Sequence, residues 1–150
     1  MTLILRDMEK SDLKFINDIR NHPSTRENLE NNSVINYPDT LLWFQKSSPK
    51  WLIIEHENHK VGYVRVSDDT GNSICIGCDI HPDKRRRGHA FEAYNLLIDN
   101  LYARKYSVLW LKVFEKNTAA VNLYKKLGFK SVGFEFIRNE KYLTMIHNRV

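Results

Sequence analysis

A chain of 150 residues is most simply one domain spanning 1–150, and it is large enough to bury a sizeable core. With 42% hydrophobic and 27% charged residues it is too apolar for disorder and typical of a soluble globular protein. The net charge of +5 suits anionic ligands, from nucleic acid to small phosphates, without choosing between them.

The same sequence gives no sign of a membrane protein. No run approaches the ~18 uninterrupted apolar residues of a membrane span. The N-terminal MTLILRDMEK has neither a basic leader nor a small-residue cleavage site. We therefore expect no membrane association and a cytoplasmic location.

The first fifty residues predict one strand followed by two helices. Thr2 to Arg6 form the strand, and Ser11 can cap a helix that carries an apolar stripe. The next stretch, RNHPSTRENLENN, is polar and contains Pro23, which predicts a loop or a short irregular helix. The second helix is expected from Asp39 to Lys46.

The middle of the chain predicts an antiparallel meander. Its three strand-like runs, KWLIIEH, KVGYVRVS and NSICIGCDI, are separated by the turn-forming ENH and DDTGN. The two cysteines, Cys75 and Cys78, fall within the last run. Residues three apart on a strand point to opposite faces, so we interpret both as small buried residues and expect no redox pair and no metal.

The second half of the chain alternates helices and strands. Apolar residues from Ala90 to Leu101 follow helical spacing, and the apolar run SVLWLKVF predicts a strand. Asn117 and Gly128 can begin and end a further helix, and two strands close the chain around a turn at Asn139-Glu140. The order β-α-α-β-β-β-α-β-α-β-β indicates a mixed α/β domain with a mostly antiparallel sheet and one parallel crossover.

The segment DKRRRGHA joins the strand ending near Ile80 to the long helix. Four cations, Lys84 to Arg87, precede Gly88 and Ala90. Small residues let a ligand approach the backbone, and the first turn of a helix offers unpaired N–H groups and the positive end of its dipole. This pattern predicts a pyrophosphate site. A basic run is also typical of a nucleic-acid patch; since interleaved aromatic residues are missing, nucleic-acid binding is only the alternative.

Two motifs carry a resemblance to a known family. RRRGHA, as R-x-x-G-x-A, resembles the acyl-CoA pyrophosphate loop of the GNAT N-acetyltransferases, and NTAAVNLYKKLGF resembles their N-x-x-A-x-x-x-Y-x-x-x-G-F segment at every motif position. The resemblance covers almost the whole chain. It implies the GNAT fold, with helices on both faces of the sheet, and acetyl-CoA as co-substrate. The cofactor-binding residues that it implies are Ile80, His81, Arg85, Arg86, Arg87, Gly88, His89, Ala90, Asn117 and Tyr124.

The implied reaction transfers an acetyl group to a primary amine. An alkylamine has a pKa of about 10.4, so the acceptor must lose a proton, and attack on the thioester creates an oxyanion that needs a donor. The resemblance places this donor at the backbone N–H of Ile80 or His81. Tyr124 is expected to protonate the leaving thiolate, although a tyrosine at this spacing is also compatible with a core position. The predicted general bases are Asp79 and His81, with Glu55, Glu135 or a water relay as alternatives.

The first two predicted helices and the loop between them are expected to bind the acceptor, and their sequence indicates a small amine. R-N-x-P-x-x-R followed by W-F resembles acetyltransferases of nucleotide-linked 4-amino sugars. Arg20 and Arg26 are expected to meet a nucleotide diphosphate, Asn21 belongs to the same segment, and Trp43 is expected to stack on a ring. The other interpretation is that the arginines are solvated and that Trp43 belongs to the core.

Two further acceptor classes stay open. A polyamine would need carboxylates, and Glu27 and Glu30 are available. In the ribosomal-protein N-terminal acetyltransferases, the strand before the Asn segment resembles LWLEV and carries a functional carboxylate. This chain has LWLKV there, so Lys112 takes the place of that carboxylate and argues against this branch. The strand edges at the end of the chain also allow a homodimer.

Overall fold

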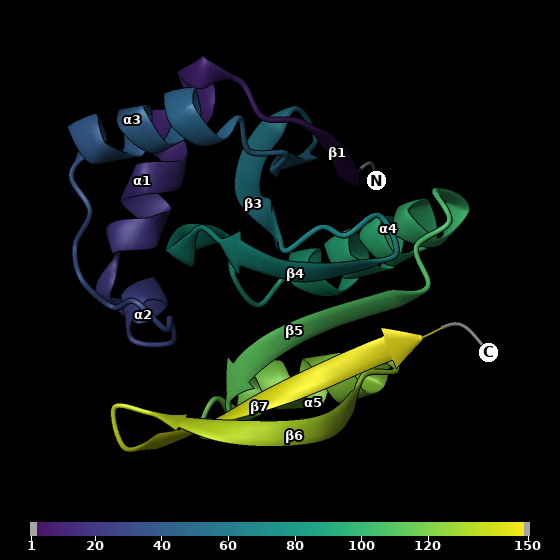
Figure 1. The fold of residues 1–150 in the computed structure, drawn as a ribbon. Helices are drawn as coiled ribbons and strands as arrows, with labels where there is room; N and C mark the ends of the chain where they lie inside the picture. Colours follow the sequence, from purple (N-terminus) through teal and green to yellow (C-terminus); the bar gives the residue numbers. More distant parts are fainter. Residues whose placement is uncertain (1–2, 149–150) are drawn as a thin grey trace. The chain divides into compact units, whose positions relative to one another are not determined.

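The computed structural model describes residues 3–148, and its elements follow the predicted order (Figure 1). The chain forms two compact units. The first comprises residues 3–66 and 78–93, and the second comprises residues 67–77 and 94–148. The assignment of 1–150 to a single domain stays a prediction.

The first unit combines an antiparallel sheet with the N-terminal helices. Strand order is β1-β2-β3-β4, and the two central residues of the β2–β3 turn, Glu57 and Asn58, have the positive φ that a two-residue hairpin turn requires. The polar segment around Pro23 forms the short helix α2. The elements are β1 (Leu3–Asp7), α1 (Leu13–Asn21), α2 (Pro23–Arg26), α3 (Tyr37–Ser47), β2 (Leu52–His56), β3 (His59–Ser67), the end of β4 (Ser73–Ile80) and the start of α4 (His89–Ala103).

The start of α1 differs from the prediction. Ser11 does not cap the helix, because a 3-10 turn, Lys10–Asp12, comes first. The carboxylate of Asp12 accepts a hydrogen bond from the Glu9 amide at 2.8 Å. Asp12 is buried, and it also binds Arg6 through two hydrogen bonds of 2.9 Å and Lys60 at 2.7 Å. One carboxylate therefore joins β1, the start of α1 and β3.

Strands β3 and β4 approach each other closely at Gly62. A Cβ atom at this position would lie 2.4 Å from the carbonyl oxygen of Asp79 and 2.9 Å from the Ile80 side chain. Only glycine fits here without a shift of the backbone. The close approach sets the end of β4 against β3 immediately before the basic loop.

The second unit contains the predicted parallel crossover. The first half of β4 pairs in parallel with β5 (Val108–Phe114), which pairs antiparallel with β7 (Glu140–Asn148), and β7 pairs antiparallel with β6 (Lys130–Ile137). The final turn is centred one residue earlier than predicted, since Arg138 and Asn139 have positive φ and Glu140 already belongs to β7.

Both predicted ends of the last helix, α5 (Thr118–Leu127), are confirmed. The Asn117 side chain accepts a hydrogen bond from the Ala120 amide, and Gly128 ends the helix with φ +103°. The mixed, mostly antiparallel sheet is likewise confirmed. Among residues 3–148, no helix has the length and apolar character needed to cross a membrane.

The close approach at Gly62 predicts a large stability effect. Gly62→Ala should lower the free energy of unfolding by about 2 kcal/mol or more, because the new methyl group overlaps backbone atoms of β4. The control is Gly133→Ala on β6, where a Cβ meets nothing within 4 Å and the change should stay within about 0.5 kcal/mol. Urea unfolding of both variants measures the difference, and equal stability would contradict the steric explanation.

Candidate functional site

The basic loop follows β4 as predicted and opens α4. It runs from His81 through a short 3-10 turn, Pro82–Lys84, to Gly88. Arg86 has φ +63° and Gly88 has φ +80°, so two left-handed residues redirect the backbone just before the helix. Arg86, Arg87 and Gly88 are exposed. The first N–H groups of α4 and two cationic side chains thus accompany an accessible stretch of backbone.

Arg85 differs from its two neighbours because its guanidinium is bound inside the first unit. Its Nε donates to the Ile80 carbonyl at 3.0 Å. Its Nη1 and Nη2 donate to the hydroxyls of Ser24 at 2.6 Å and of Thr25 at 2.8 Å. Arg85 was predicted to bind the cofactor, and the structure gives it a second role as the tie between the loop and α2.

His89 begins α4, but its side chain points into the protein. It is 6% exposed, and its ring lies 4.7 Å from that of His56. Burial, followed by the neighbouring His56, lowers the pKa of His89. Because its ring is buried, the predicted contact of His89 with the cofactor is one that its backbone would make. Ala90, the next residue, is half-buried.

The end of β4 holds the predicted bases. Asp79 is largely buried and pairs with Arg65, with Nε and Oδ2 3.0 Å apart. Burial, followed by the charge of Asp79, raises the pKa of the neighbouring Tyr63 well above its ordinary value. Asp79 is thus a structural ion-pair partner as well as a candidate base.

His81 is held at both its backbone and its ring. Its amide donates to the Val61 carbonyl at 2.8 Å, which leaves the Ile80 amide as the predicted oxyanion donor. Its Nδ1 accepts from the Asp83 amide at 3.1 Å, and the ring stacks on Phe15. Because Nδ1 accepts this bond, a neutral His81 carries its proton on Nε2.

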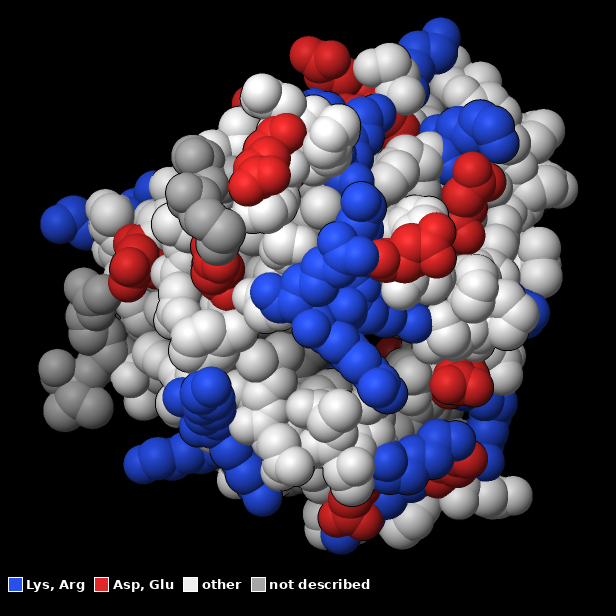
Figure 2. All heavy atoms as spheres, turned by 180° about the vertical axis from the view of Figure 1, so that it is seen from behind, with Lys and Arg blue, Asp and Glu red and all other residues white. Residues whose placement is uncertain are grey.

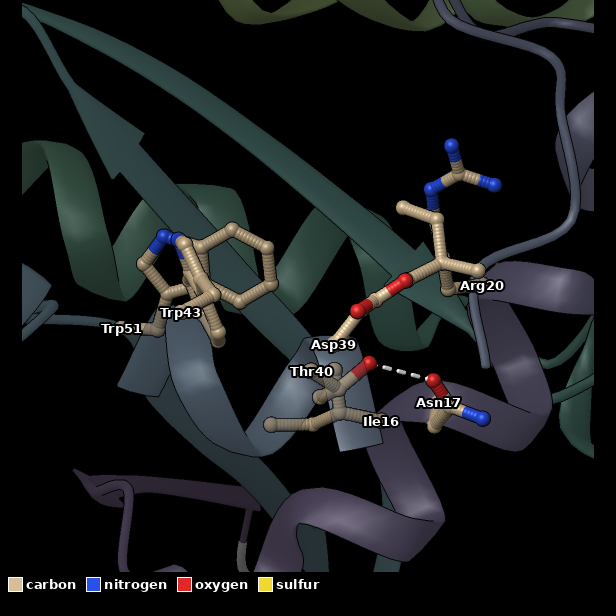
Figure 3. A pocket seen from close by; sticks show the side chains of 8 residues that line it. Ile16, Asn17, Arg20, Asp39, Thr40, Trp43 and Trp51 are labelled. Carbon is tan, nitrogen blue, oxygen red and sulfur yellow. Dashed lines mark hydrogen bonds between the residues drawn. The ribbon is translucent and has the colours of Figure 1, made fainter. Parts of the chain in front are cut away.

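A cavity of about 400 Å³ lies in the first unit between α1, α3 and the start of β2 (Figure 3). Two predicted acceptor residues, Arg20 and Trp43, line it. Sequence reasoning missed Asp39, although it precedes Trp43 by one helical turn, a spacing that places both on one face of α3. The lining residues are Ile16, Asn17, Arg20, Ile35, Asp39, Thr40, Trp43 and Trp51.

The other predicted acceptor residues hold the connection between α2 and α3. Asn21 exchanges two hydrogen bonds with the backbone of Ile35, at 2.6 and 2.9 Å. Arg26 donates to the carbonyls of Asn21 at 2.9 Å and Asn32 at 3.1 Å. Neither residue lines the cavity, and both shape the segment that borders it.

Arg20 belongs to the same scaffold even though it lines the cavity. Its Nη2 donates to the Asn31 carbonyl at 2.7 Å and its Nη1 to the Ser33 carbonyl at 3.1 Å. Burial lowers the pKa of Arg20. In Figure 3 the guanidinium points away from Asp39 and the tryptophans. The stem of Arg20 therefore lines the cavity while its charge binds backbone oxygens.

The second unit carries Asn117 and Tyr124. The hydroxyl of Tyr124 lies 3.1 Å from that of Tyr94 on α4, and its ring makes edge contacts with Tyr94 and Phe129. Asn117 is half-buried at the start of α5. Tyr124 is thus a half-buried phenol whose hydroxyl belongs to a hydrogen-bonded pair. Lys112 pairs with Glu135 at 2.8 Å.

The lowered pKa of His89 predicts a pH-dependent stability. The folded protein binds fewer protons than the unfolded chain in mild acid. The contribution of the neutral His89 ring to the free energy of unfolding is therefore intact above its ordinary pKa of 6.5. It is lost as the pH falls through the lower pKa of the folded state. His56, Glu92, Arg87 and Lys84 are the charged or titratable groups around it. His89→Gln should flatten the pH dependence of urea unfolding below about pH 6.5. An unaltered profile in this variant would refute the assignment.

The fold is similar to solved acetyltransferases. Spermidine N-acetyltransferase from Vibrio cholerae, solved with CoA and spermine, superposes with a TM-score of 0.89 at 21% identity over 97% of this chain and 95% of that one. Ribosomal-protein-alanine N-acetyltransferase from Brucella melitensis gives 0.80 at 21% identity over 97% and 99%. The structure of yncA from Salmonella typhimurium, which holds acetyl-CoA, gives 0.80 at 19% identity over 99% and 94%.

Sequence comparison gives the family. A segment of 50 residues is 42% identical to the [ribosomal protein bS18]-alanine N-acetyltransferase of Escherichia coli K12, covering 33% of this chain and 34% of that protein. The chain thus matches about a third of the length of such curated relatives. The profile of the acetyltransferase (GNAT) family matches residues 14–129, most of the chain. The chain therefore belongs to the GNAT acetyltransferase family.

Proposed function

We propose that this protein transfers an acetyl group from acetyl-CoA to the primary amine of a small molecule. The observation that carries the proposal is the exposed backbone at Arg86–Gly88, which turns through two left-handed residues into the first turn of α4. Helix N-termini of this kind bind phosphates through free N–H groups and the helix dipole. The pyrophosphate of CoA is the ligand proposed for this loop, and a cytoplasmic location fits it.

The cations of the loop divide into two functions. Arg85 anchors the loop through three hydrogen bonds, one to the end of β4 and two to α2, which keeps the backbone N–H groups in a fixed arrangement before the ligand arrives. Arg86 and Arg87 are exposed and are proposed to contact phosphate oxygens. Figure 2 shows one face on which basic side chains gather with few acidic ones among them, as an anionic ligand requires.

The chemical step requires an oxyanion donor and an acid for the leaving group. The Ile80 amide is the proposed donor, since the His81 amide already binds the Val61 carbonyl. Tyr124 is the proposed acid. A phenol near pKa 10 can protonate a departing thiolate through a short hydrogen bond. The Tyr94 hydroxyl supports this role because it can orient the phenolic proton.

The proposed acceptor site is the cavity along α1 and α3. Trp43 on its wall is suited to stack on a ring, as the predicted nucleotide-linked amino sugar would need. The predicted diphosphate contacts have less support, because the guanidinium groups of Arg20 and Arg26 already bind backbone carbonyls. The amino sugar thus stays a prediction that rests on Trp43.

The homodimer allowed by the sequence also stays a prediction. Strand β6 ends the strand order β4-β5-β7-β6 of the second unit. Its residues Val132, Phe134 and Phe136 are 58%, 62% and 65% exposed and alternate along the strand. Exposed apolar side chains on one face of an end strand support pairing between two copies.

Acetyl-CoA affinity tests the proposal. Gly88→Glu should abolish binding, because it adds a negative charge and a side chain where phosphate is expected. The control, Gly71→Glu, has the same charge and a similar φ, +82° against +80°, in an exposed turn, so both variants carry a similar strain of about 1–2 kcal/mol. Calorimetric titration should show micromolar or tighter binding to the native protein and to Gly71→Glu, unaffected by a short DNA duplex. Salt-sensitive DNA binding without acetyl-CoA binding would replace the enzyme with a nucleic-acid-binding module.

Turnover tests the role of Tyr124. Tyr124→Phe should keep acetyl-CoA affinity and lower kcat at least about tenfold, because the thiolate loses its proton donor. Tyr106→Phe is the matched control, since it also removes a hydroxyl that makes a hydrogen bond in the second unit, to Asp69. Thiol release followed with a chromogenic reagent reports kcat for both variants. Unchanged turnover in Tyr124→Phe would exclude this residue from the mechanism.

A further inference from the structure

Among residues 3–148, one carboxylate lines the cavity of the first unit, that of Asp39, which is an exposed residue. Its only other charged lining residue, Arg20, turns its guanidinium away and binds the carbonyls of Asn31 and Ser33 (Figure 3). The remaining lining residues are uncharged. The charge that a ligand meets inside this cavity is therefore negative.

Among the described residues, the Asp39 carboxylate has no ion-pair partner. Its backbone N–H binds the Asn36 side chain at 2.9 Å, which fixes the residue in the first turn of α3. Within residues 3–148, no Lys, Arg or His nitrogen forms an ion pair with its carboxylate. Other acidic groups of the first unit, such as Asp12, Glu55 and Asp79, bind cations at 2.7 to 3.0 Å. Asp39 differs from them in keeping its carboxylate available to a ligand.

A fixed aromatic surface stands beside this carboxylate. Trp43 follows Asp39 by one helical turn, so both side chains share one face of α3. Trp43 packs edge-on against Trp51 at 4.7 Å, and Trp51 stacks on buried Tyr63 at 5.4 Å. A carboxylate next to an aromatic ring attracts an alkylammonium, by charge and by the cation–π interaction.

We infer that the acceptor carries a second, protonated nitrogen, which Asp39 binds beside Trp43. This inference rests on the proposed function and narrows its acceptor. The nitrogen that attacks the thioester must be neutral when it reacts, so an ammonium that stays bound to Asp39 throughout the reaction is a different nitrogen. The acceptor class is thus an alkyl diamine or a longer polyamine, since a carboxylate at this position disfavours a phosphate group.

The reaction remains balanced. The neutral amine nitrogen forms a bond to the acetyl carbon, the carbon–sulfur bond breaks, and the thiolate takes one proton. Starting from an ammonium, the nitrogen loses two protons; one ends on the CoA thiol and the other in solvent. The distal ammonium keeps its charge throughout, so its contact with Asp39 contributes to binding rather than to the chemical step.

The test compares 1,4-diaminobutane with butylamine, which lacks the second nitrogen. The native protein should acetylate the diamine with the higher kcat/KM. Asp39→Asn should lower kcat/KM for the diamine about 2- to 5-fold, mainly through KM, and leave butylamine unchanged, because an ion pair with an exposed carboxylate is lost. Asp18→Asn, on the exposed side of α1 and paired only with Lys14, is the matched control and should change neither.

The outcomes separate the inference from the proposed function. Failure of the native protein to bind acetyl-CoA in calorimetry would overturn both. Acetyl-CoA binding with equal use of the two amines, or with no use of the diamine, would overturn the inference alone. An equal loss for both amines in Asp39→Asn, with acetyl-CoA affinity intact, would also overturn it, since Asp39 would then support the cavity rather than bind a cation.

Discussion

The buried carboxylate of Asp12 is the constraint on which the first unit depends. Burial alone would raise the pKa of Asp12, but hydrogen bonds from Arg6 and Lys60 outweigh it and hold that pKa far below its usual range. Losing both cations would leave a buried charge uncompensated, which costs several kcal/mol. Since these partners come from β1 and β3, the start of α1 has one position on the sheet. The cavity lies along this helix, and so the ion cluster also sets the proposed acceptor site.

Arg85 fixes the position of the basic loop, as Asp12 fixes the start of α1. Its guanidinium joins the carbonyl that ends β4 to two hydroxyls of α2. Gly62 brings that same strand end against β3, so the loop starts from a rigid edge. The segment after α2 is in turn held by Arg20, which binds the carbonyls of Asn31 and Ser33, and by Arg26, which binds that of Asn32. The first unit thus uses several arginines to order backbone that has no strand or helix to satisfy it.

Periodicity and capping residues predicted the elements well, because each depends on neighbours in the chain. The pattern around Asn117 and Gly128 located both ends of α5, and the helical spacing that begins at Ala90 located the start of α4 to within one residue. The partners of individual charged groups could not be predicted, because they depend on distant backbone: nothing local indicates that Arg20 binds carbonyls 11 and 13 residues away. Asp39 was missed for a related reason: helical spacing places it on the same face of α3 as Trp43, but only the fold shows that a cavity lies along that face.

The step that removes the acceptor proton remains the most demanding part of the mechanism. An amine of pKa about 10.4 is about 0.1% neutral near pH 7.4, which costs about 4 kcal/mol if only the neutral form reacts. His81 is poorly placed as a base, because its Nδ1 accepts from the Asp83 amide and a neutral ring then carries its proton on Nε2. A carboxylate base would have to act from within an ion pair, as the pairs Asp79–Arg65, Glu55–Arg6 and Glu135–Lys112 show. A water relay avoids both obstacles, since water can pass the proton to solvent without disturbing an ion pair.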